Sequence, residues 1–112
     1  MLRKSQRLNL SLPQNRKIFR EKHLSSKNLT LYFRNANQFK AAVVIPKKNV
    51  PLAVDRNQVR RILYIQIRQC EKLCANKEIL ILYRSPNSLR EKDKRKMIEK
   101  ELGELLKKAN LF

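Results

Sequence analysis

The sequence is poor in several residue types, and each shortage removes a class of protein. Its 112 residues include one glycine, one histidine and no tryptophan. With a single glycine, the chain has no glycine-rich loop to cradle the phosphates of a nucleotide. Cys70 and Cys74 would need two further ligands to hold a zinc ion, and His23 lies far away in the sequence. We therefore expect both cysteines to be small buried apolar residues.

Long apolar runs are also absent. No segment approaches the ~18 apolar residues of a transmembrane helix. Residues 1–14 carry basic side chains without the apolar stretch of a signal peptide, so we expect a cytoplasmic protein. Apolar residues still make up 42% of the chain, which is normal for a globular protein. We expect one domain over residues 1–112, with residues 1–12 as a flexible N-terminal arm.

Acidic residues are scarce relative to basic ones. The chain has 9 Asp and Glu against 27 Lys and Arg, a net charge of +18. Residues 1–70 contain 16 basic and 2 acidic residues, a net of +14, whereas residues 71–112 contain 11 and 7, a net of +4. This self-repulsion is best explained by a polyanionic partner, and nucleic acid is the first candidate. An anionic membrane is the second, but an inserting helix needs bulky apolar residues that the core requires here.

Hydrophobic periodicity predicts three helices and three strands. In chain order we expect a helix at 13–23, strands at 28–33 and 39–45, a helix at 55–74, a strand at 78–83 and a helix from Ser88. Residues 34–38 are rich in asparagine, which is typical of a hairpin loop between the first two strands. The order of elements predicts a two-layer α/β sandwich, with a small mixed sheet covered mainly on one face.

The helix expected at 55–74 has a face that suits a core. Asp55, with Gln58 three residues later, fits a capping box at its start. At about 100° per residue, the apolar arc consists of Val59, Leu63, Ile67, Cys70 and Cys74, flanked by Ile62 and Leu73. The opposite side consists of Asn57, Arg61, Tyr64, Arg68 and Lys72.

The same helix carries arginine in its first turns, where the helix dipole disfavours cations. Arg56 and Arg60 lie at the border of the apolar arc, where the stem can pack on the core while the guanidinium stays exposed. Lys47 and Lys48 come just before, in a connection stiffened by two prolines. Because these side chains suit phosphate oxygens, the segment predicts a phosphate-binding surface. The alternative is a helix face that is only solvated.

These features resemble the protein subunit of bacterial ribonuclease P. The resemblance is carried by the lysine pair at 47–48, a short connection and the helical stretch 56–61, "RNQVRR", which is similar to the family signature Arg-Asn-Arg-hydrophobic-Lys-Arg. The segments "LTLYF", "EILILYRSP" and "LGELLKKANLF" extend it over nearly the whole chain. The chain departs from the family pattern in places: Gln58 stands at the third signature position in place of arginine, Tyr64 replaces a usual basic residue, and the connection at 49–54 is one residue longer than usual and lacks the glycine.

The resemblance implies a fold like the second domain of ribosomal protein S5, with a left-handed crossover through the basic helix. It implies binding to the catalytic RNA, one protein to one RNA, and to the 5′ leader of precursor transfer RNA. In that family the RNA cuts with bound Mg²⁺, and the protein supplies no catalytic side chain. The sequence agrees, because no nucleophilic or metal-binding constellation can be placed in it.

The resemblance also assigns site residues. Contacts to the catalytic RNA fall on Arg56, Asn57, Arg60 and Arg61, supported by Lys47, Lys48 and Arg68. Leader contact falls on Tyr32 and Phe19, through stacking on an unpaired base. Tyr32 is expected on the face opposite Leu29, Leu31 and Phe33, and the alternative is a partly exposed strand tyrosine. For Phe19 we favour core packing, and for His23 a surface position.

Two other functions remain as alternatives. A basic structural protein of the ribosome, bound to ribosomal RNA, shares the charge and the size of this chain. A DNA-binding repressor is the other, although no helix-turn-helix spacing is evident.

Overall fold

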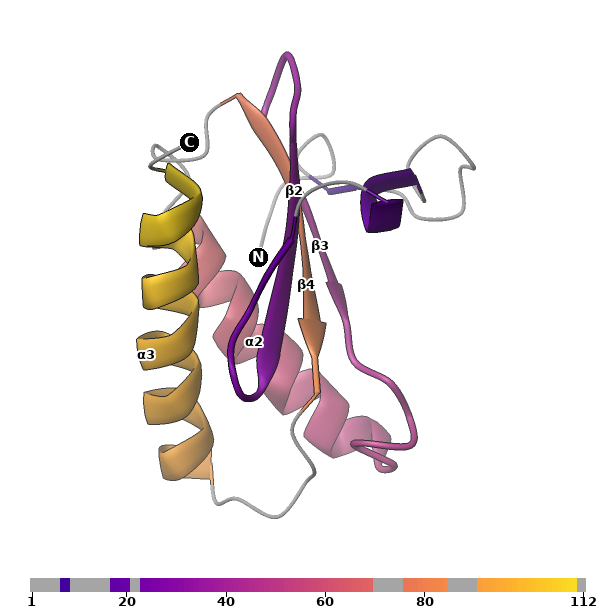
Figure 1. Ribbon diagram of the computed structural model, residues 1–112. Coiled ribbons are helices and arrows are strands. Elements are labelled where there is room, and N and C mark those ends of the chain that lie inside the picture. Colours follow the sequence, from indigo (N-terminus) through magenta and orange to yellow (C-terminus); the bar gives the residue numbers. More distant parts are fainter. Residues whose placement is uncertain (1–6, 9–16, 21–22, 70–75, 85–90, 111–112) are drawn as a thin grey trace.

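The computed structural model describes residues 7–8, 17–20, 23–69, 76–84 and 91–110. The elements in chain order are the 3₁₀ helix η2 (Lys17–Arg20), the strands β1 (His23–Ser25), β2 (Leu29–Asn35) and β3 (Lys40–Val44), the helix α2 (Ala53–Gln69), the strand β4 (Lys77–Tyr83) and the helix α3 (Glu91–Asn110). Figure 1 shows α2 and α3 on one face of the sheet and η2 on the other side. The predicted two-layer sandwich is confirmed.

The four strands form one mixed sheet in the order β1-β2-β4-β3. β2 runs antiparallel to β1 and to β4, whereas β3 runs parallel to β4. The predicted hairpin between the strands at 28–33 and 39–45 is wrong, because β4 lies between them. Ile79, Leu80 and Ile81 of β4 are all buried, and a strand buried on both faces belongs inside the sheet.

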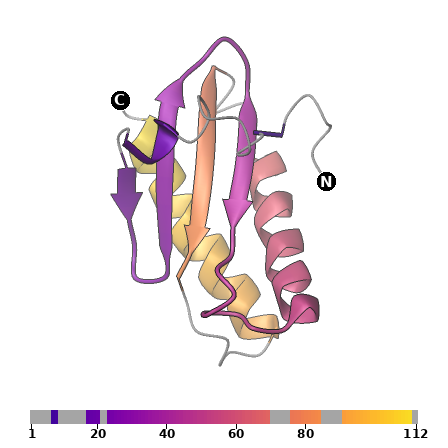
Figure 2. The same ribbon diagram turned by 90° about the vertical axis from the view of Figure 1, so that its right-hand side faces the viewer.

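The chain passes from β3 to its parallel neighbour β4 through α2. In Figure 2 the sheet lies in front of the helices, β3 and β4 both run downward, and β4 lies to the left of β3. A path that goes behind the sheet and returns on the left is left-handed. Parallel crossovers are right-handed in about 98% of cases, so the general rule fails here and the resemblance gives the correct hand.

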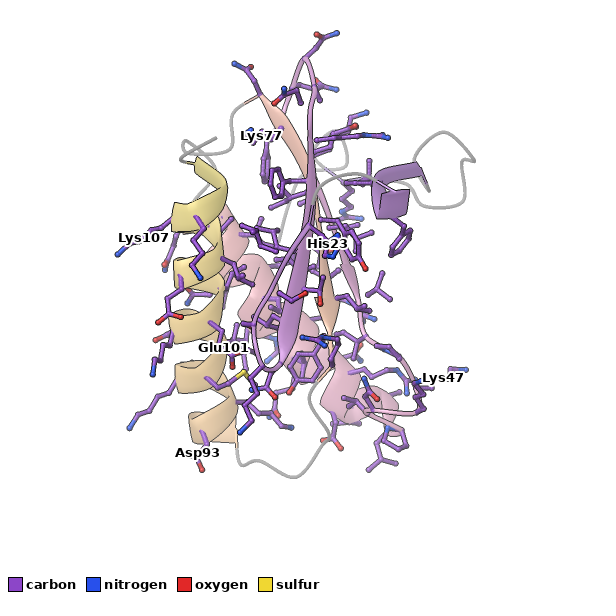
Figure 3. All side chains as sticks on the ribbon, viewed as in Figure 1. His23, Lys47, Lys77, Asp93, Glu101 and Lys107 are labelled. Carbon is purple, nitrogen blue, oxygen red and sulfur yellow. The ribbon has the colours of Figure 1, made fainter. Side chains whose placement is uncertain are left out.

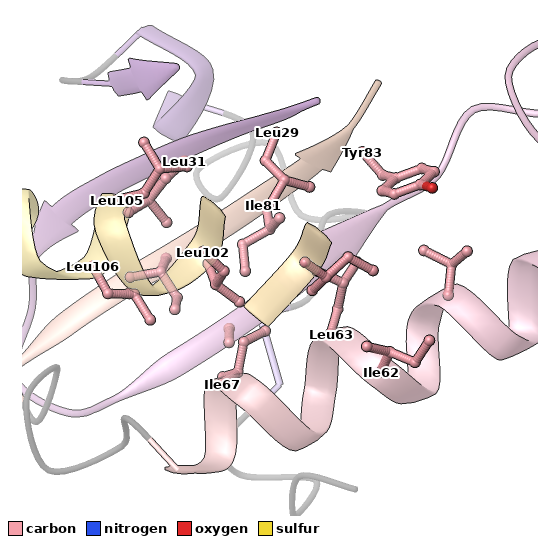
Figure 4. Close-up of a cluster of buried hydrophobic side chains, with 14 of the residues drawn as sticks. Leu29, Leu31, Ile62, Leu63, Ile67, Ile81, Tyr83, Leu102, Leu105 and Leu106 are labelled. Carbon is pink, nitrogen blue, oxygen red and sulfur yellow. The ribbon is translucent and has the colours of Figure 1, made fainter. Parts of the chain in front are cut away.

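The main core lies between the sheet and the two helices (Figure 4). Leu29, Leu31 and Phe33 of β2 face this core, as the alternation predicts. The buried residues of α2 are Val59, Ile62, Leu63 and Ile67, as predicted. The buried apolar residues of α3 are Ile98, Leu102, Leu105 and Leu106, which recur at the helical period. The predictions for Cys70, Leu73 and Cys74 lie outside the described residues.

Two of the predicted helices need correction. The backbone N–H of Arg56 donates to the carbonyl of Leu52 at 3.0 Å, so α2 begins two residues before Asp55 and the capping box is wrong. Within the predicted helix at 13–23, only a 3₁₀ turn forms among the described residues, and His23 already begins β1. β1 itself was not predicted. The predicted helix start at Ser88 lies outside the described residues.

Two residues of the predicted N-terminal arm are described. Arg7 forms an isolated parallel β-bridge with Ala41 of β3, and the backbone N–H of Leu8 donates to the carbonyl of Ala41 at 2.9 Å. Leu8 is buried in a second, smaller cluster with Ile18 and Leu80, on the sheet face that the helices do not cover. This segment therefore lies along the β3 edge.

Candidate nucleic-acid interface

The connection between β3 and α2 is a compact turn. The backbone N–H groups of Asn49 and Val50 both donate to the carbonyl of Pro46 at 3.1 Å, and the Asn49 side-chain amide donates to the carbonyl of Tyr83 at 3.3 Å. These bonds fasten the turn to the end of β4. Lys47 and Lys48 are exposed on it, and Figure 3 shows Lys47 pointing away from the fold. Three hydrogen bonds therefore hold the connection for which the two prolines predict stiffness.

Arg56 joins this turn to the helix. Its Nη1 donates to the carbonyl of Val50 at 3.0 Å and to that of Pro51 at 2.7 Å. The side chain is half-buried, as expected for a residue at the border of the apolar arc. The guanidinium is therefore fixed in position by the loop that carries the two lysines.

The other predicted contacts follow along α2. Nη1 of Arg60 donates to Oδ1 of Asn57, three residues earlier, at 2.8 Å. Arg61 and Arg68 are exposed and lie two turns apart. The turn and the helix thus present one run of predicted contacts, here named the basic α2 surface: Lys47, Lys48, Arg56, Asn57, Arg60, Arg61 and Arg68.

Charge of the opposite sign is nearly absent from this part of the chain. Between residues 40 and 69, Asp55 is the only acidic residue, and it lies in the first turn of α2. A carboxylate there interacts favourably with the helix dipole. The segment that carries the basic α2 surface therefore has a single carboxylate among its own residues.

Gln58 faces the neighbouring helix. Its Oε1 accepts a hydrogen bond from Nζ of Lys94 on α3 at 3.3 Å, and Lys94 is only 3% exposed. The position where the family pattern has an arginine therefore contacts a buried ammonium group in this chain.

Tyr64 lies deeper than its expected place on the outer side of α2. Its ring is half-buried and packs against the main core. Burial raises the pKa of the Tyr64 hydroxyl above its usual 10.0, although the charges of Arg60 and Arg7 act in the opposite direction. The hydroxyl therefore stays neutral at physiological pH.

A second group of predicted residues gathers on the uncovered face of the sheet. The ring centroids of Phe19 and Tyr32 lie 5.2 Å apart with the planes at 68°, and those of His23 and Tyr32 lie 5.4 Å apart. We name these three residues the aromatic cluster. Phe19 is 41% exposed, so its expected core packing is wrong, and the neighbouring Ile18 is the buried residue.

His23 is exposed, as predicted, but its neighbour was not foreseen. It stands directly opposite Tyr32 in the pairing of β1 with β2. The sequence signal is the segment "SSKN" at 25–28, because serine and asparagine favour turns and a turn there brings residues 23 and 32 together.

The two candidate surfaces belong to different layers. Tyr32 packs with the smaller cluster on the uncovered face, whereas α2 lies on the opposite face (Figure 1). One partner can therefore cover α2 while another occupies the aromatic cluster.

The described residues contain neither a metal-binding cluster nor a membrane-spanning helix. They contain no group of three or more histidine, cysteine, aspartate or glutamate residues placed to hold a metal ion. Neither of their long helices is apolar enough to cross a lipid bilayer.

Comparison with known proteins gives the family. The profile of the Ribonuclease P family matches residues 2–110. The chain belongs to the Ribonuclease P family. It is a ribonuclease P protein subunit, and this finding favours that reading over the ribosomal alternative. No individually curated protein matches the sequence.

Solved ribonuclease P proteins share the fold. The protein of Staphylococcus aureus superposes with a TM-score of 0.72 at 18% identity, covering 97% of this chain and 93% of that one. The protein of Thermotoga maritima gives a TM-score of 0.73 at 24% identity, covering 91% and 96%. The likeness therefore spans the whole sandwich.

Proposed function

We propose that this ribonuclease P protein binds the catalytic RNA of the enzyme through the basic α2 surface. The observation that carries the proposal is the anchoring of that surface. Arg56 fastens the lysine-bearing turn, and the buried residues of α2 fix the helix to the sheet. Cations held in this way bind phosphates without first losing much side-chain freedom.

The proposed binding is dominated by phosphate contacts. Arginine binds phosphate oxygens with a planar fork, and lysine contributes a point charge. Each neutralised phosphate releases counterions from the RNA, so the affinity falls steeply as the salt concentration rises. One protein binds one RNA, in the cytoplasm.

The aromatic cluster is the proposed contact for the 5′ leader of precursor transfer RNA. Unpaired bases stack on aromatic rings, and this stacking tolerates any sequence because every base has a π face. Leaders of different sequence can therefore use the same rings. Tyr32 lies between Phe19 and His23 and is the central residue of the cluster.

The proposed role of the protein is binding and positioning, and not bond cleavage. The two surfaces consist of arginine, lysine, asparagine and aromatic side chains, which suit phosphates and bases. We assign the cleavage of the leader to the RNA and to Mg²⁺ ions that the RNA holds. Phosphate neutralisation by the protein lowers the Mg²⁺ concentration that the complex needs.

Reconstitution tests this function. Added to a bacterial ribonuclease P RNA at low Mg²⁺, the protein should restore cleavage of precursor transfer RNA, because it replaces part of the neutralisation that Mg²⁺ otherwise supplies. The measurement is the rate of release of the 5′ leader, with the protein alone as control. An RNA whose cleavage is no faster with the protein than without it would contradict the proposal.

Substitution of Tyr32 tests the leader contact. Tyr32→Leu removes the ring and keeps an apolar side chain on the strand, so binding of precursor transfer RNA to the reconstituted enzyme should weaken about tenfold, as expected for one lost stacking contact. Mature transfer RNA lacks the leader, and its binding should change less than twofold. Equal losses for the two RNAs would remove the leader role from Tyr32.

A further inference from the structure

The outer side of α2 has a hollow whose lining includes an aromatic and an aliphatic side chain. Phosphate binding alone does not require such side chains. Its volume is about 440 Å³, and its lining consists of Arg61, Tyr64, Ile65, Arg68 and Gln69. This size lies within the range of small-ligand clefts, about 300–1,000 Å³. The hollow is therefore large enough for a planar group.

Tyr64 is the innermost member of the lining. The other four residues are exposed, whereas the tyrosine is half-buried and packs against the core. An aromatic ring held from behind loses little freedom when a second ring stacks on it. Ile65, which is 49% exposed, adds an apolar surface beside it.

Positive charge surrounds the ring. Arg61 precedes Tyr64 by three residues and Arg68 follows it by four, so both are its neighbours along the helix surface. Arg60 and Arg7 also act electrostatically on the tyrosine hydroxyl. Among the described residues, no acidic side chain lines the hollow. A ligand that fits must combine a stacking plane with negative charge on both sides.

We infer that the hollow holds one unpaired nucleotide of the RNA, with its base stacked on Tyr64 and its flanking phosphates bound by Arg61 and Arg68. Base-paired RNA does not fit, because the faces of its bases are covered by their neighbours in the stack. An acidic peptide would meet the arginines but has no plane for the ring. The inference rests on the proposed RNA binding by α2 and adds a nucleotide site to it.

Two variants of Tyr64 separate stacking from charge. Tyr64→Leu removes the ring without changing the charge, so affinity for a bacterial ribonuclease P RNA should fall about tenfold, while the slope of log affinity against log salt stays the same. Tyr64→Phe keeps the ring and should bind within about twofold of the wild type. Tyr64→Phe is also the matched control, because it keeps the stacking plane that the leucine variant lacks.

The outcomes are distinct. If the wild type fails to bind the RNA, the proposed function fails. If the wild type binds and Tyr64→Leu binds equally well, only the nucleotide site fails. Circular dichroism melting shows whether the leucine variant is folded.

Crosslinking of the wild-type complex makes the test independent of the variants. Trypsin cuts after Arg61 and Arg68, so Tyr64 lies on the peptide at 62–68. Ultraviolet light should attach a nucleotide to that peptide, which mass spectrometry detects. Crosslinks that occur only on other peptides would overturn the inference.

Discussion

Arg56 shows how a cation is accommodated at the start of a helix. The dipole of α2 disfavours positive charge there. The guanidinium turns back to the carbonyls of Val50 and Pro51 and donates a hydrogen bond to each. Hydrogen bonds from a charged donor are about twice as strong as neutral ones, which offsets the dipole. The same bonds hold the turn with Lys47 and Lys48 in place, so one side chain serves both stability and binding.

Glu101 on α3 plays a comparable part for the aromatic cluster. Its carboxylate accepts bonds from the Ser26 hydroxyl at 2.5 Å, and from the Asn28 backbone and side-chain amides, both at 2.8 Å. These bonds fix the turn between β1 and β2, and β1 carries His23. Burial raises the pKa of Glu101, but the hydrogen bonds and the charge of Lys27 outweigh it, so the pKa lies below its usual 4.5.

Acid should therefore release this turn. Because the pKa is lower in the folded protein than in the unfolded chain, the stabilisation is complete above about pH 4.5 and is lost as the pH falls through the folded value. Glu101→Gln should lower the free energy of unfolding by about 1 kcal/mol at pH 7, and the difference should shrink below pH 4. Urea unfolding across pH measures it, with the exposed Glu104→Gln as control. A deficit that is unchanged at low pH would contradict the assignment.

Prediction from sequence at the scale of single residues depended on periodicity. The period of α2 gave the buried side chains and the half-buried border arginine correctly. It could not show that the guanidinium of Arg56 returns to its own loop, nor that Tyr64 turns inward. Those details depend on the path of the turn and on the β3 edge, which local patterns do not contain.

At the scale of elements, a polar contact between α2 and α3 accompanies their apolar packing. Gln58 accepts a hydrogen bond from the buried Lys94. An arginine at position 58, as in the family pattern, would bring a second cation against this ammonium. The glutamine satisfies the lysine without adding charge, which gives a physical reason for this departure in the chain.

Gln58→Arg should therefore destabilise the fold. We expect a loss of about 1–2 kcal/mol in the free energy of unfolding, because two like charges would share a desolvated contact. Lys94→Gln in the same chain should restore most of it, so the pair should show a coupling energy in a double-mutant cycle. Urea unfolding of the wild type and the three variants measures the coupling. Additive effects of the two substitutions would show that the side chains act separately.

The elements themselves were largely predictable, and their connections were not. Three strands and both long helices were found where periodicity indicated them. The hairpin between β2 and β3 was wrong, because loop composition does not show that a distant third strand inserts between two neighbours in sequence. β1 has three residues, too few for a periodic signal. The hand of the crossover came from the resemblance alone, since general rules give the opposite hand.

At the scale of the whole molecule, the charge is divided between the two helices. Between residues 40 and 69, Asp55 is the only acidic residue, whereas α3 mixes both signs along its length. Figure 3 shows Lys107 of α3 and Lys47 of the turn pointing away from the molecule on opposite sides. RNA bound to α2 should therefore leave the last turn of α3 exposed to solvent.

The salt dependence of binding to a bacterial ribonuclease P RNA tests this arrangement most directly. Arg60→Gln with Arg61→Gln should reduce the slope of log affinity against log salt by roughly 1.5–2, because each lost phosphate contact removes about 0.9. Lys107→Gln with Lys108→Gln removes the same charge from the exposed end of α3 and should leave the slope almost unchanged. Equal reductions in both double variants would mean that net charge binds the RNA without a defined surface on α2, and would contradict the account.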